Sequence, residues 1–344
     1  MRVLVRCDAD RSTGVGHLGR ALALTEAARA RGWEVVLCGR VEGAWALEQI
    51  TAARLDVLPA VDEPGALADL ALETGAQVLH LDHYGDLGPS HALHEQADAR
   101  HLLLTAVADF DFGVREADLV VNPNYGGDQV QPAAAGRYLG GPSFALVRAA
   151  VRSARAERGD RAVREDDAGQ APDSDLRCLV VMGGTDPFGA TRPMVELLAQ
   201  AAEVDVAVDV LTVDHRALEE HFGTVHGHLT LRFLPPQADL PRRLAATDVA
   251  VSAAGTTMLE LSCIGVPSAV LCVTDNQARG YAAAVAAGTA LGLGTLANRS
   301  GAAPLRTLLG DAVLRAELAA AGRRTVDGRG PERVLDAMAE LHAG

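Results

Sequence analysis

The first group of residues suited to chemistry lies between Asp8 and His17, shortly after the predicted buried strand 3–6. Gly14 and Gly16 permit tight backbone turns there, and His17 stands where a helix is predicted to begin. The positive end of a helix disfavours an imidazolium ion, so it favours the neutral ring that a general base requires. The sequence therefore offers His17 as a candidate base. The alternative is that the glycines only tighten a turn and that His17 caps the helix.

A second candidate loop follows the apolar run 178–182 and begins with Gly183, Gly184 and Thr185. Glycine lets backbone amides approach a phosphate closely, and the start of the following helix favours an anion. We therefore predict a phosphate-binding loop here, with an ordinary strand-to-helix turn as the alternative.

A third candidate loop contains Gly255, Thr256 and Thr257, and Glu260 follows one turn into the next helix. Small residues and hydroxyl groups at a helix start suit a diphosphate, and a carboxylate further along can hold a pair of ribose hydroxyls. The alternative is that Thr256 or Thr257 caps the helix and that Glu260 completes a capping box.

The elements that must position these loops alternate between strand and helix. The predicted strands cover residues 3–6, 35–38, 78–81, 102–107, 119–121, 178–182, 206–213, 229–233, 249–252 and 268–273. The predicted helices cover residues 17–31, 190–202, 240–246, 257–264, 277–287 and 331–342. Such alternation indicates two α/β halves, each with a parallel sheet covered on both faces. Ligands of open α/β sheets bind beyond the carboxyl ends of the strands, where all three loops lie.

A change in composition divides the chain. Residues 153–175 are rich in Arg, Asp, Glu, Ala and Gly and have almost no large apolar side chains, so we expect a polar linker or insertion there. Residues 1–152 would then form an N-terminal domain that carries His17. Residues 176–344 would form a C-terminal nucleotide-binding domain, whose last helix is a candidate for packing back on the first domain.

Composition excludes several function classes. The net charge of −14 over 344 residues argues against nucleic acid as a partner. The chain has no lysine, which excludes a lysine Schiff base and the lysine-bearing phosphate loop. The five cysteines form no CxxC pair and are expected to be buried free thiols. No apolar run approaches the ~20 residues that a membrane span needs, so we expect a cytoplasmic protein.

An ordered set of motifs extends over most of the chain. The segments are RCDADRSTGVGHLGR, LDHYG, AVADFD, VNPN, GPSFALVR, VMGGTDP, SAAGTTMLELSCIGVP and TDNQ. Together they resemble the UDP-sugar hydrolase of the pseudaminic acid pathway and its spore-coat polysaccharide relatives. Those proteins are similar to the lipid II-forming N-acetylglucosaminyltransferase. The resemblance implies a GT-B-like α/β fold with two Rossmann-like doubly wound domains facing a cleft.

The resemblance also implies a reaction. Water would attack the anomeric carbon of a UDP-activated amino or deoxy sugar with inversion, and His17 would remove its proton. Tyr84 would help to place the sugar. The implied substrate-binding residues of the first domain are Asp8, Gly14, Gly16, Asp82, Asp109, Asn124 and Arg148, the last near the diphosphate.

The second domain would hold the nucleotide. The implied nucleotide-binding residues are Gly183, Gly184, Thr185, Gly255, Thr256, Thr257, Glu260, Asn276 and Gln277. No cofactor is expected. No metal is expected either, because no histidine group or acidic pair has the spacing of a metal site.

Two other functions remain open. A glycosyltransferase would use the same donor and the same base but would admit an acceptor hydroxyl in place of water. The loop that contains Gly255 is closer to the transferase pattern than to that of some hydrolases. A sugar-nucleotide-binding regulator would keep the fold without the reaction.

Overall fold

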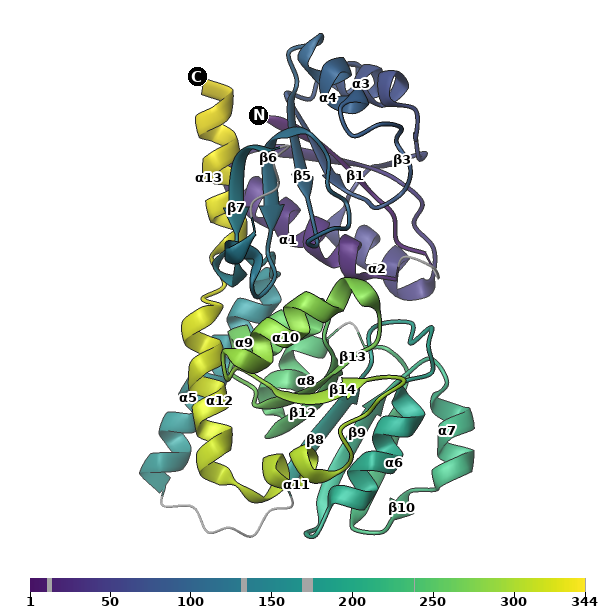
Figure 1. Ribbon diagram of the computed structural model, residues 1–344, viewed down its shortest axis with the longest axis vertical. Helices are drawn as coiled ribbons and strands as arrows, with labels where there is room; N and C mark the ends of the chain where they lie inside the picture. The colour runs from purple at the N-terminus through teal and green to yellow at the C-terminus, as the bar shows by residue number, and fades with distance from the viewer. Residues whose placement is uncertain (11–13, 131–134, 169–175, 238, 344) are drawn as a thin grey trace. The chain divides into compact units, whose positions relative to one another are not determined.

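The computed structural model describes residues 1–10, 14–130, 135–168, 176–237 and 239–343. Its contacts divide the chain into two units (Figure 1). Unit 1 comprises Met1–Ala149 and Gly328–Gly344, and unit 2 comprises Ala150–Asp327.

Unit 1 is built on a seven-stranded sheet in the order β3-β2-β1-β4-β5-β6-β7. Every neighbouring pair of strands is parallel. The strands are β1 (Arg2–Cys7), β2 (Glu34–Cys38), β3 (Val57–Leu58), β4 (Val78–Asp82), β5 (Leu103–Val107), β6 (Ala117–Asn122) and β7 (Ala135–Gly140). The strand order reverses direction between β1 and β4, which is where doubly wound sheets bind their ligands.

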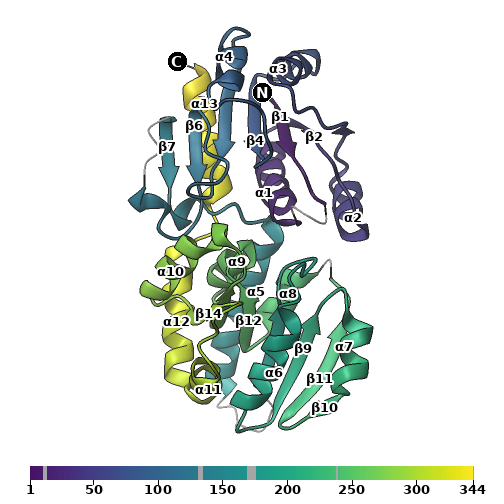
Figure 2. The same ribbon diagram turned by 45° about the vertical axis from the view of Figure 1, so that its right-hand side comes forward.

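Helices cover both faces of this sheet. They are α1 (Gly16–Ala30), α2 (Ala44–Ala53), α3 (Pro64–Glu73), α4 (Ala92–Asp98) and α13 (Gly330–Ala343), with short 3₁₀ turns η1 (Gly127–Gln129) and η2 (Pro142–Phe144). The C-terminal helix α13 packs against α1, β5 and β6 (Figure 2). Val334 and Met338 of α13 are buried in one core cluster with Leu18 and Leu22 of α1. The end of the chain therefore completes the core of the unit that contains its beginning.

Unit 2 repeats the same plan. Its sheet has the order β10-β11-β9-β8-β12-β13-β14, and only the pair β10 and β11 is antiparallel. The strands are β8 (Leu176–Val181), β9 (Val206–Leu211), β10 (Val225–His226), β11 (Leu229–Leu234), β12 (Val249–Ala253), β13 (Ser268–Cys272) and β14 (Leu291–Thr295). The reversal of strand order in unit 2 falls between β8 and β12.

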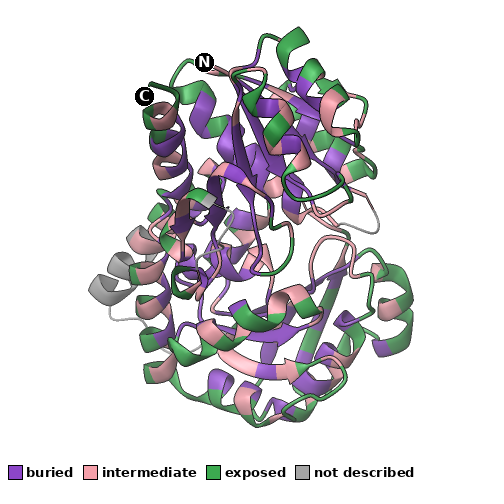
Figure 3. Cartoon of the chain, turned by 45° about the horizontal axis from the view of Figure 1, so that its top comes forward, coloured by how far each residue is buried: buried purple, intermediate pink, exposed green. Residues whose placement is uncertain are grey.

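The helices of unit 2 pack around a core that consists mostly of Val, Leu, Ala and Met. Figure 3 shows which residues of the chain are buried. They are α5 (Ala149–Ala168), α6 (Thr191–Ala201), α7 (His215–Phe222), α8 (Leu240–Ala246), α9 (Thr256–Ile264), α10 (Ala278–Ala286), α11 (Ala303–Gly310) and α12 (Ala312–Thr325), with the 3₁₀ turn η3 (Asp275–Gln277). None of the described helices is long and apolar enough to cross a membrane.

The segment 153–175 differs from the expected linker. It begins inside helix α5, whose Val151 and Ala154 are fully buried. Arg155 donates to the carbonyl oxygens of Cys263 and Val326, and Arg158 donates to those of Gly265 and Ala245. These two arginines satisfy backbone carbonyl oxygens of unit 2, so the charged composition of residues 153–158 does not mean an unpacked segment. Residues 169–175 lie outside the described chain.

Candidate active site

The carboxyl ends of β1 and β4 bring His17 and Asp82 together. Asp82 is the last residue of β4 and pairs with Cys7 at the end of β1. His17 lies in the first turn of α1, the helix that follows β1. Nδ1 of His17 is 2.5 Å from Oδ1 of Asp82, and both side chains are buried.

The position of Asp82 fixes which ring nitrogen of His17 carries the proton. Burial works to raise the pKa of Asp82, but Arg20 and then His17 outweigh it and hold the pKa well below its usual range. An ionised carboxylate only accepts, so Nδ1 of His17 must carry the hydrogen. In the neutral ring the lone pair then resides on Nε2, which is the arrangement of a histidine base oriented by a carboxylate.

Arg20 links this pair to a second carboxylate. Its Nε and Nη2 donate to the two oxygens of Asp82 at 2.8 and 2.7 Å. Its Nη1 donates to both oxygens of Asp109 at 3.0 and 2.9 Å. Burial lowers the pKa of Arg20, but Asp109 and Asp82 outweigh it and raise the pKa above its ordinary value. The guanidinium is therefore a fixed positive charge between two buried acids.

Asn124 extends the network to the end of β6. Its amide nitrogen donates to Oδ1 of Asp109 at 2.6 Å and to Oδ1 of Asn122 at 3.1 Å. Asp109 follows β5 and Asn122 ends β6. Four elements of unit 1 thus contribute to one polar cluster around His17.

Tyr84 closes one side of the histidine. The centroids of its ring and the His17 ring are 4.4 Å apart in an edge-to-face arrangement, with Phe112 6.2 Å beyond. Val15 is the N-cap residue of α1 and its side chain makes no cap hydrogen bond, so the reading of His17 as a cap is wrong. Gly14 has a φ of +72°, a conformation that favours glycine, and Gly16 is the first residue of the helix.

The structure places Asp8 in a different network. Its carboxylate accepts from Arg6 at 2.7 and 3.1 Å and from the backbone nitrogen of Arg40 at 2.7 Å. Burial alone would raise the pKa of Asp8, but the hydrogen bonds from Arg6 and from the backbone of Arg40 outweigh it and lower the pKa. Nδ1 of His83 is 3.4 Å from the same carboxylate. Both oxygens of Asp8 are thus already held by groups of unit 1.

Arg148 also lies outside the histidine cluster. Its Nη1 donates to Oε1 of Gln49 at 3.1 Å, and its guanidinium carbon stands 5.8 Å from the centroid of the Trp45 ring. Both partners belong to α2, so this arginine is positioned by that helix.

In unit 2, the loops containing Gly183 and Gly255 differ in how their helices begin. After β8, Gly183 has a φ of +86°, and Gly184 and Thr185 follow. The carboxylate of Asp186 accepts from the nitrogens of Ala190 and Thr191 at 2.8 and 2.9 Å. The start of α6 is therefore capped by a side chain of its own chain.

The N-cap residue of α9 is a glycine, which has no side chain to cap the helix. Gly255 is the N-cap residue, so the capping box of Thr256 or Thr257 with Glu260 is not formed. Thr256 and Thr257 are the first two residues of α9, and Glu260 is half-buried one turn later. Within the described residues, the hydroxyl oxygen of Ser252 is buried and has no hydrogen-bond partner. A helix start whose N-cap is glycine, beside other small residues, is the better phosphate-binding candidate of the two loops.

The loop after β13 approaches the same helix start. A Cβ atom on Gly255 would come within 3.5 Å of Nε2 of Gln277. Oε1 of Gln277 accepts from the nitrogen of Val273 at 3.0 Å, and Oδ1 of Asn276 accepts from the hydroxyl of Thr274 at 2.5 Å. The structure thus brings the Gln277 loop beside the Gly255 loop.

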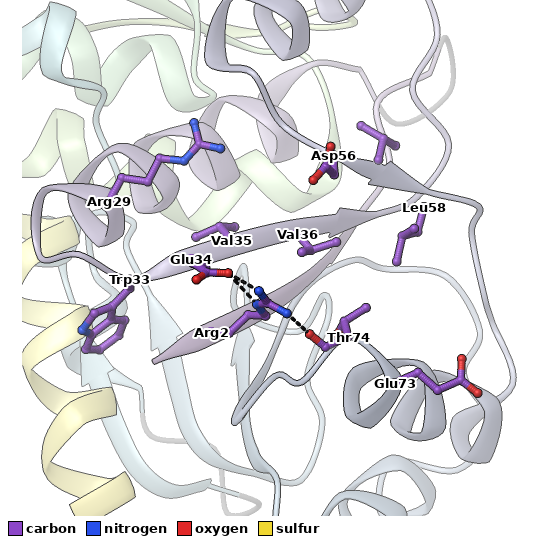
Figure 4. Close-up of a pocket in the computed structure, with 11 residues that line it drawn as sticks. Arg2, Arg29, Trp33, Glu34, Val35, Val36, Asp56, Leu58, Glu73 and Thr74 are labelled. Atoms are coloured by element: carbon purple, nitrogen blue, oxygen red, sulfur yellow. Dashed lines mark hydrogen bonds and ion pairs between the residues drawn. The ribbon is translucent and has the colours of Figure 1, made fainter.

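A pocket of about 790 Å³ lies elsewhere, at the amino ends of β1 and β2 (Figure 4). Arg2 lies between Glu34 and Thr74 there and bonds to both. None of the predicted site residues lines this pocket. It is separate from the histidine cluster.

Sequence reasoning missed Arg20 and Asn122. Arg20 stands three residues after His17, so both face the same side of α1, and this spacing was the available signal. Asn122 carried no signal beyond its place at the end of a strand.

Comparison with known proteins supports the fold class. No protein-family model matches the chain. A search of curated proteins likewise finds no match. Among solved structures, MurG of Acinetobacter baumannii is similar with a TM-score of 0.68 at 15% identity, over 98% of this chain and 99% of that chain. The spinosyn forosaminyltransferase SpnP is similar with a TM-score of 0.66 at 16% identity, over 100% of both chains.

A third similar structure is the UDP-GlcNAc 2-epimerase of Neisseria meningitidis bound to UDP-GlcNAc. Its TM-score is 0.62 at 10% identity, over 99% of this chain and 100% of that chain. At such low identity these likenesses define the fold alone. The chain is an α/β protein of GT-B-like fold with two Rossmann-like, doubly wound domains, as the sequence predicted.

Proposed function

We propose that this protein is a nucleotide-sugar hydrolase that releases UDP from a UDP-activated amino or deoxy sugar. The observation that carries the proposal is the buried pair of His17 and Asp82, in which Asp82 also accepts hydrogen bonds from Arg20. A histidine whose Nδ1 is held by an ionised carboxylate presents Nε2 as a base.

The two units would have separate roles. Unit 2 would bind UDP, with the diphosphate at the start of α9, where Gly255 is the N-cap, and the ribose at Glu260. Gln277, Asn276 and the Gly183 loop would complete the nucleotide site. Unit 1 would bind the sugar through residues of the histidine cluster, with Tyr84 beside the base. Nucleotide bound to a similar fold, as in the epimerase holding UDP-GlcNAc, supports UDP as the leaving group.

The reaction is a substitution at the anomeric carbon. The oxygen of water forms a bond to that carbon while the bond to the diphosphate oxygen breaks, and the electron pair leaves with UDP. The proton of water passes to Nε2 of His17, and Asp82 stabilises the imidazolium that results. Attack opposite the leaving group inverts the anomeric configuration.

A small nucleophile fits the surroundings of the base. The His17 side chain is only 8% exposed, and the edge-to-face Tyr84 ring occupies one side of it. Water reaches such a site more easily than a large acceptor. The second candidate is a glycosyltransferase, which the likeness to MurG and to the forosaminyltransferase favours.

The test is UDP release from a panel of UDP-sugars in ¹⁸O-labelled water without an acceptor. We expect UDP release with the label on the freed sugar and none on UDP. Label on UDP would mean attack at phosphorus and would refute the mechanism. Release only after an alcohol acceptor is added would identify the transferase, and isomerisation of the donor would identify an epimerase.

The base is tested by His17→Asn, with exposed His91→Asn as the matched control. The His17 variant should keep its affinity for UDP and lose turnover by roughly 10²–10⁴-fold, the usual contribution of a positioned base. The control should turn over like the wild type. Lost UDP affinity with normal turnover would make His17 a binding residue.

A further inference from the structure

We infer that Arg20 is a positioning residue that keeps His17 in its neutral form by neutralising the carboxylate of Asp82. This inference rests on the proposed role of His17 as a base. It adds a residue that touches neither sugar nor water and acts through Asp82.

Arg20 contacts both Asp82 and His17. Two of its nitrogens bind the two oxygens of Asp82, and Nη2 also lies 3.2 Å from Nδ1 of His17. The same Oδ1 of Asp82 therefore accepts from Arg20 at 2.7 Å and contacts His17 at 2.5 Å. Arg20 and a protonated His17 would compete for one negative charge.

The charges around His17 explain why this competition matters. One guanidinium, Arg20, stands against two carboxylates, Asp82 and Asp109. Without Arg20, both acids would be buried with no permanent cation beside them, which is costly. Protonation of His17 would then supply a positive charge beside these carboxylates. A protonated ring cannot accept the proton of water.

The other titratable groups facing this cluster do not replace Arg20. Burial lowers the pKa of His80 on β4 to about 4 and raises that of Cys7 on β1, so both are neutral near pH 7. Tyr84 lies beside the ring, and Asn124 carries no charge.

In the neighbouring network around Asp8, the charged groups are paired with one another. Its cations, Arg6 and Arg40, bind Asp8 and Asp62. Burial, followed by the charge of Arg6, lowers the pKa of the adjacent His83 to about 4, so this ring is also neutral near pH 7. Within the described residues, Arg20 is the permanent cation that contacts both Asp82 and His17.

The experiment measures the titration of the His17 ring by NMR in the full chain labelled at histidine. The His17 signal is assigned by its loss in His17→Gln. Arg20→Gln should raise the titration midpoint of His17 by about 1–3 pH units, the usual effect of a charge a few ångströms away. Arg20→Lys keeps the charge and should leave the midpoint near that of the wild type.

A charge-balanced background guards against a variant that does not fold. Asp109→Asn alone removes one anion, and Arg20→Gln added to it leaves Asp82 as the one unpaired charge of the three. The titration midpoint of His17 should be about 1–3 pH units higher in the double variant than in Asp109→Asn alone. A purely structural role for Arg20 would change stability in both backgrounds and leave the midpoint unmoved.

The outcomes separate this inference from the proposed function. The role of Arg20 is overturned if the midpoint of His17 does not move in the folded Arg20→Gln protein. It is also overturned if the midpoint is the same in Asp109→Asn with and without Arg20→Gln, even if UDP release is normal. If no donor releases UDP, the proposed function fails while the titration still decides the role of Arg20. Where turnover is present, the acid limb of its pH profile should move with the NMR midpoint.

Discussion

Nδ1 of His17 and Oδ1 of Asp82 lie 2.5 Å apart although the two residues are separated by 65 positions in the chain. The contact exists because β1 and β4 are neighbours in the sheet, so the loop after one strand meets the end of the other. A base and the group that orients it are thus fixed by the strand order of unit 1.

Asp82→Asn should disable the base without removing it. An asparagine amide can donate to Nδ1, which would shift the ring proton to Nε2 and remove the accepting lone pair. We expect turnover to fall by roughly 10²–10⁴-fold, in steady-state assays of UDP release.

The control is Asp118→Asn, which alters a second histidine–aspartate pair of the same unit. Asp118 lies 3.1 Å from Nε2 of His94, and both side chains are about one-third exposed. Its loss should leave turnover near that of the wild type. Equal losses in the two variants would mean that Asp82 acts through stability alone.

Glu260→Ala should weaken UDP binding. If the carboxylate holds the ribose hydroxyls, its removal costs about 1–3 kcal/mol, the usual price of a charge-assisted hydrogen bond. Isothermal titration with UDP measures the difference, and exposed Glu317→Ala is the matched control on α12. Unchanged affinity in the Glu260 variant would assign the ribose to another residue.

The stability of unit 1 should fall with acidification through His80. Burial lowers the pKa of His80 to about 4, below the ordinary 6.5. Between these two values the unfolded chain binds a proton that the folded chain does not, so lowering the pH favours unfolding. From pH 7 to pH 5 this one residue should cost about 2 kcal/mol of unfolding free energy.

Denaturant unfolding of His80→Gln checks that sign. The variant should lose less stability between pH 7 and pH 5 than the wild type, whatever its stability at pH 7. Exposed His342→Gln should keep the pH dependence of the wild type. A steeper acid loss in His80→Gln would contradict the assignment of a neutral buried ring.

Arg158→Met should destabilise unit 2. The variant keeps the apolar stem but loses the hydrogen bonds to the carbonyl oxygens of Gly265 and Ala245. We expect a loss of about 1–3 kcal/mol in denaturant unfolding, because buried carbonyls are left unpaired. Arg192→Met removes only an exposed ion pair with Glu196 and should cost much less.

The sequence predicted the central strands of both sheets well, because buried parallel strands are continuous apolar runs. It missed β3 and β10, which have only two residues each, and β7 and β14, whose glycines weaken the strand signal. The composition of the sequence also predicted an unpacked segment at the start of α5. Composition does not show that backbone carbonyl groups elsewhere in the fold accept hydrogen bonds from these arginines.

The candidate site was predicted in part for a related reason. His17, Tyr84 and the loops around Gly183 and Gly255 stand out locally by type and spacing. The partnership of Asp82 with Arg20 depends on which strands become neighbours, which local patterns do not determine. Asp8 illustrates the converse, because the motif resemblance implied that it binds the sugar, while its carboxylate pairs with Arg6.

The burial of every cysteine makes the two units separately observable. Cys7 and Cys38 are enclosed in unit 1, and Cys178, Cys263 and Cys272 are enclosed in unit 2. A thiol reagent can therefore modify a sulfur atom only after the surrounding unit has opened. Mass spectrometry of the labelled peptides then records the opening rate at each cysteine, in the unit that carries the histidine and in the unit proposed to hold the nucleotide.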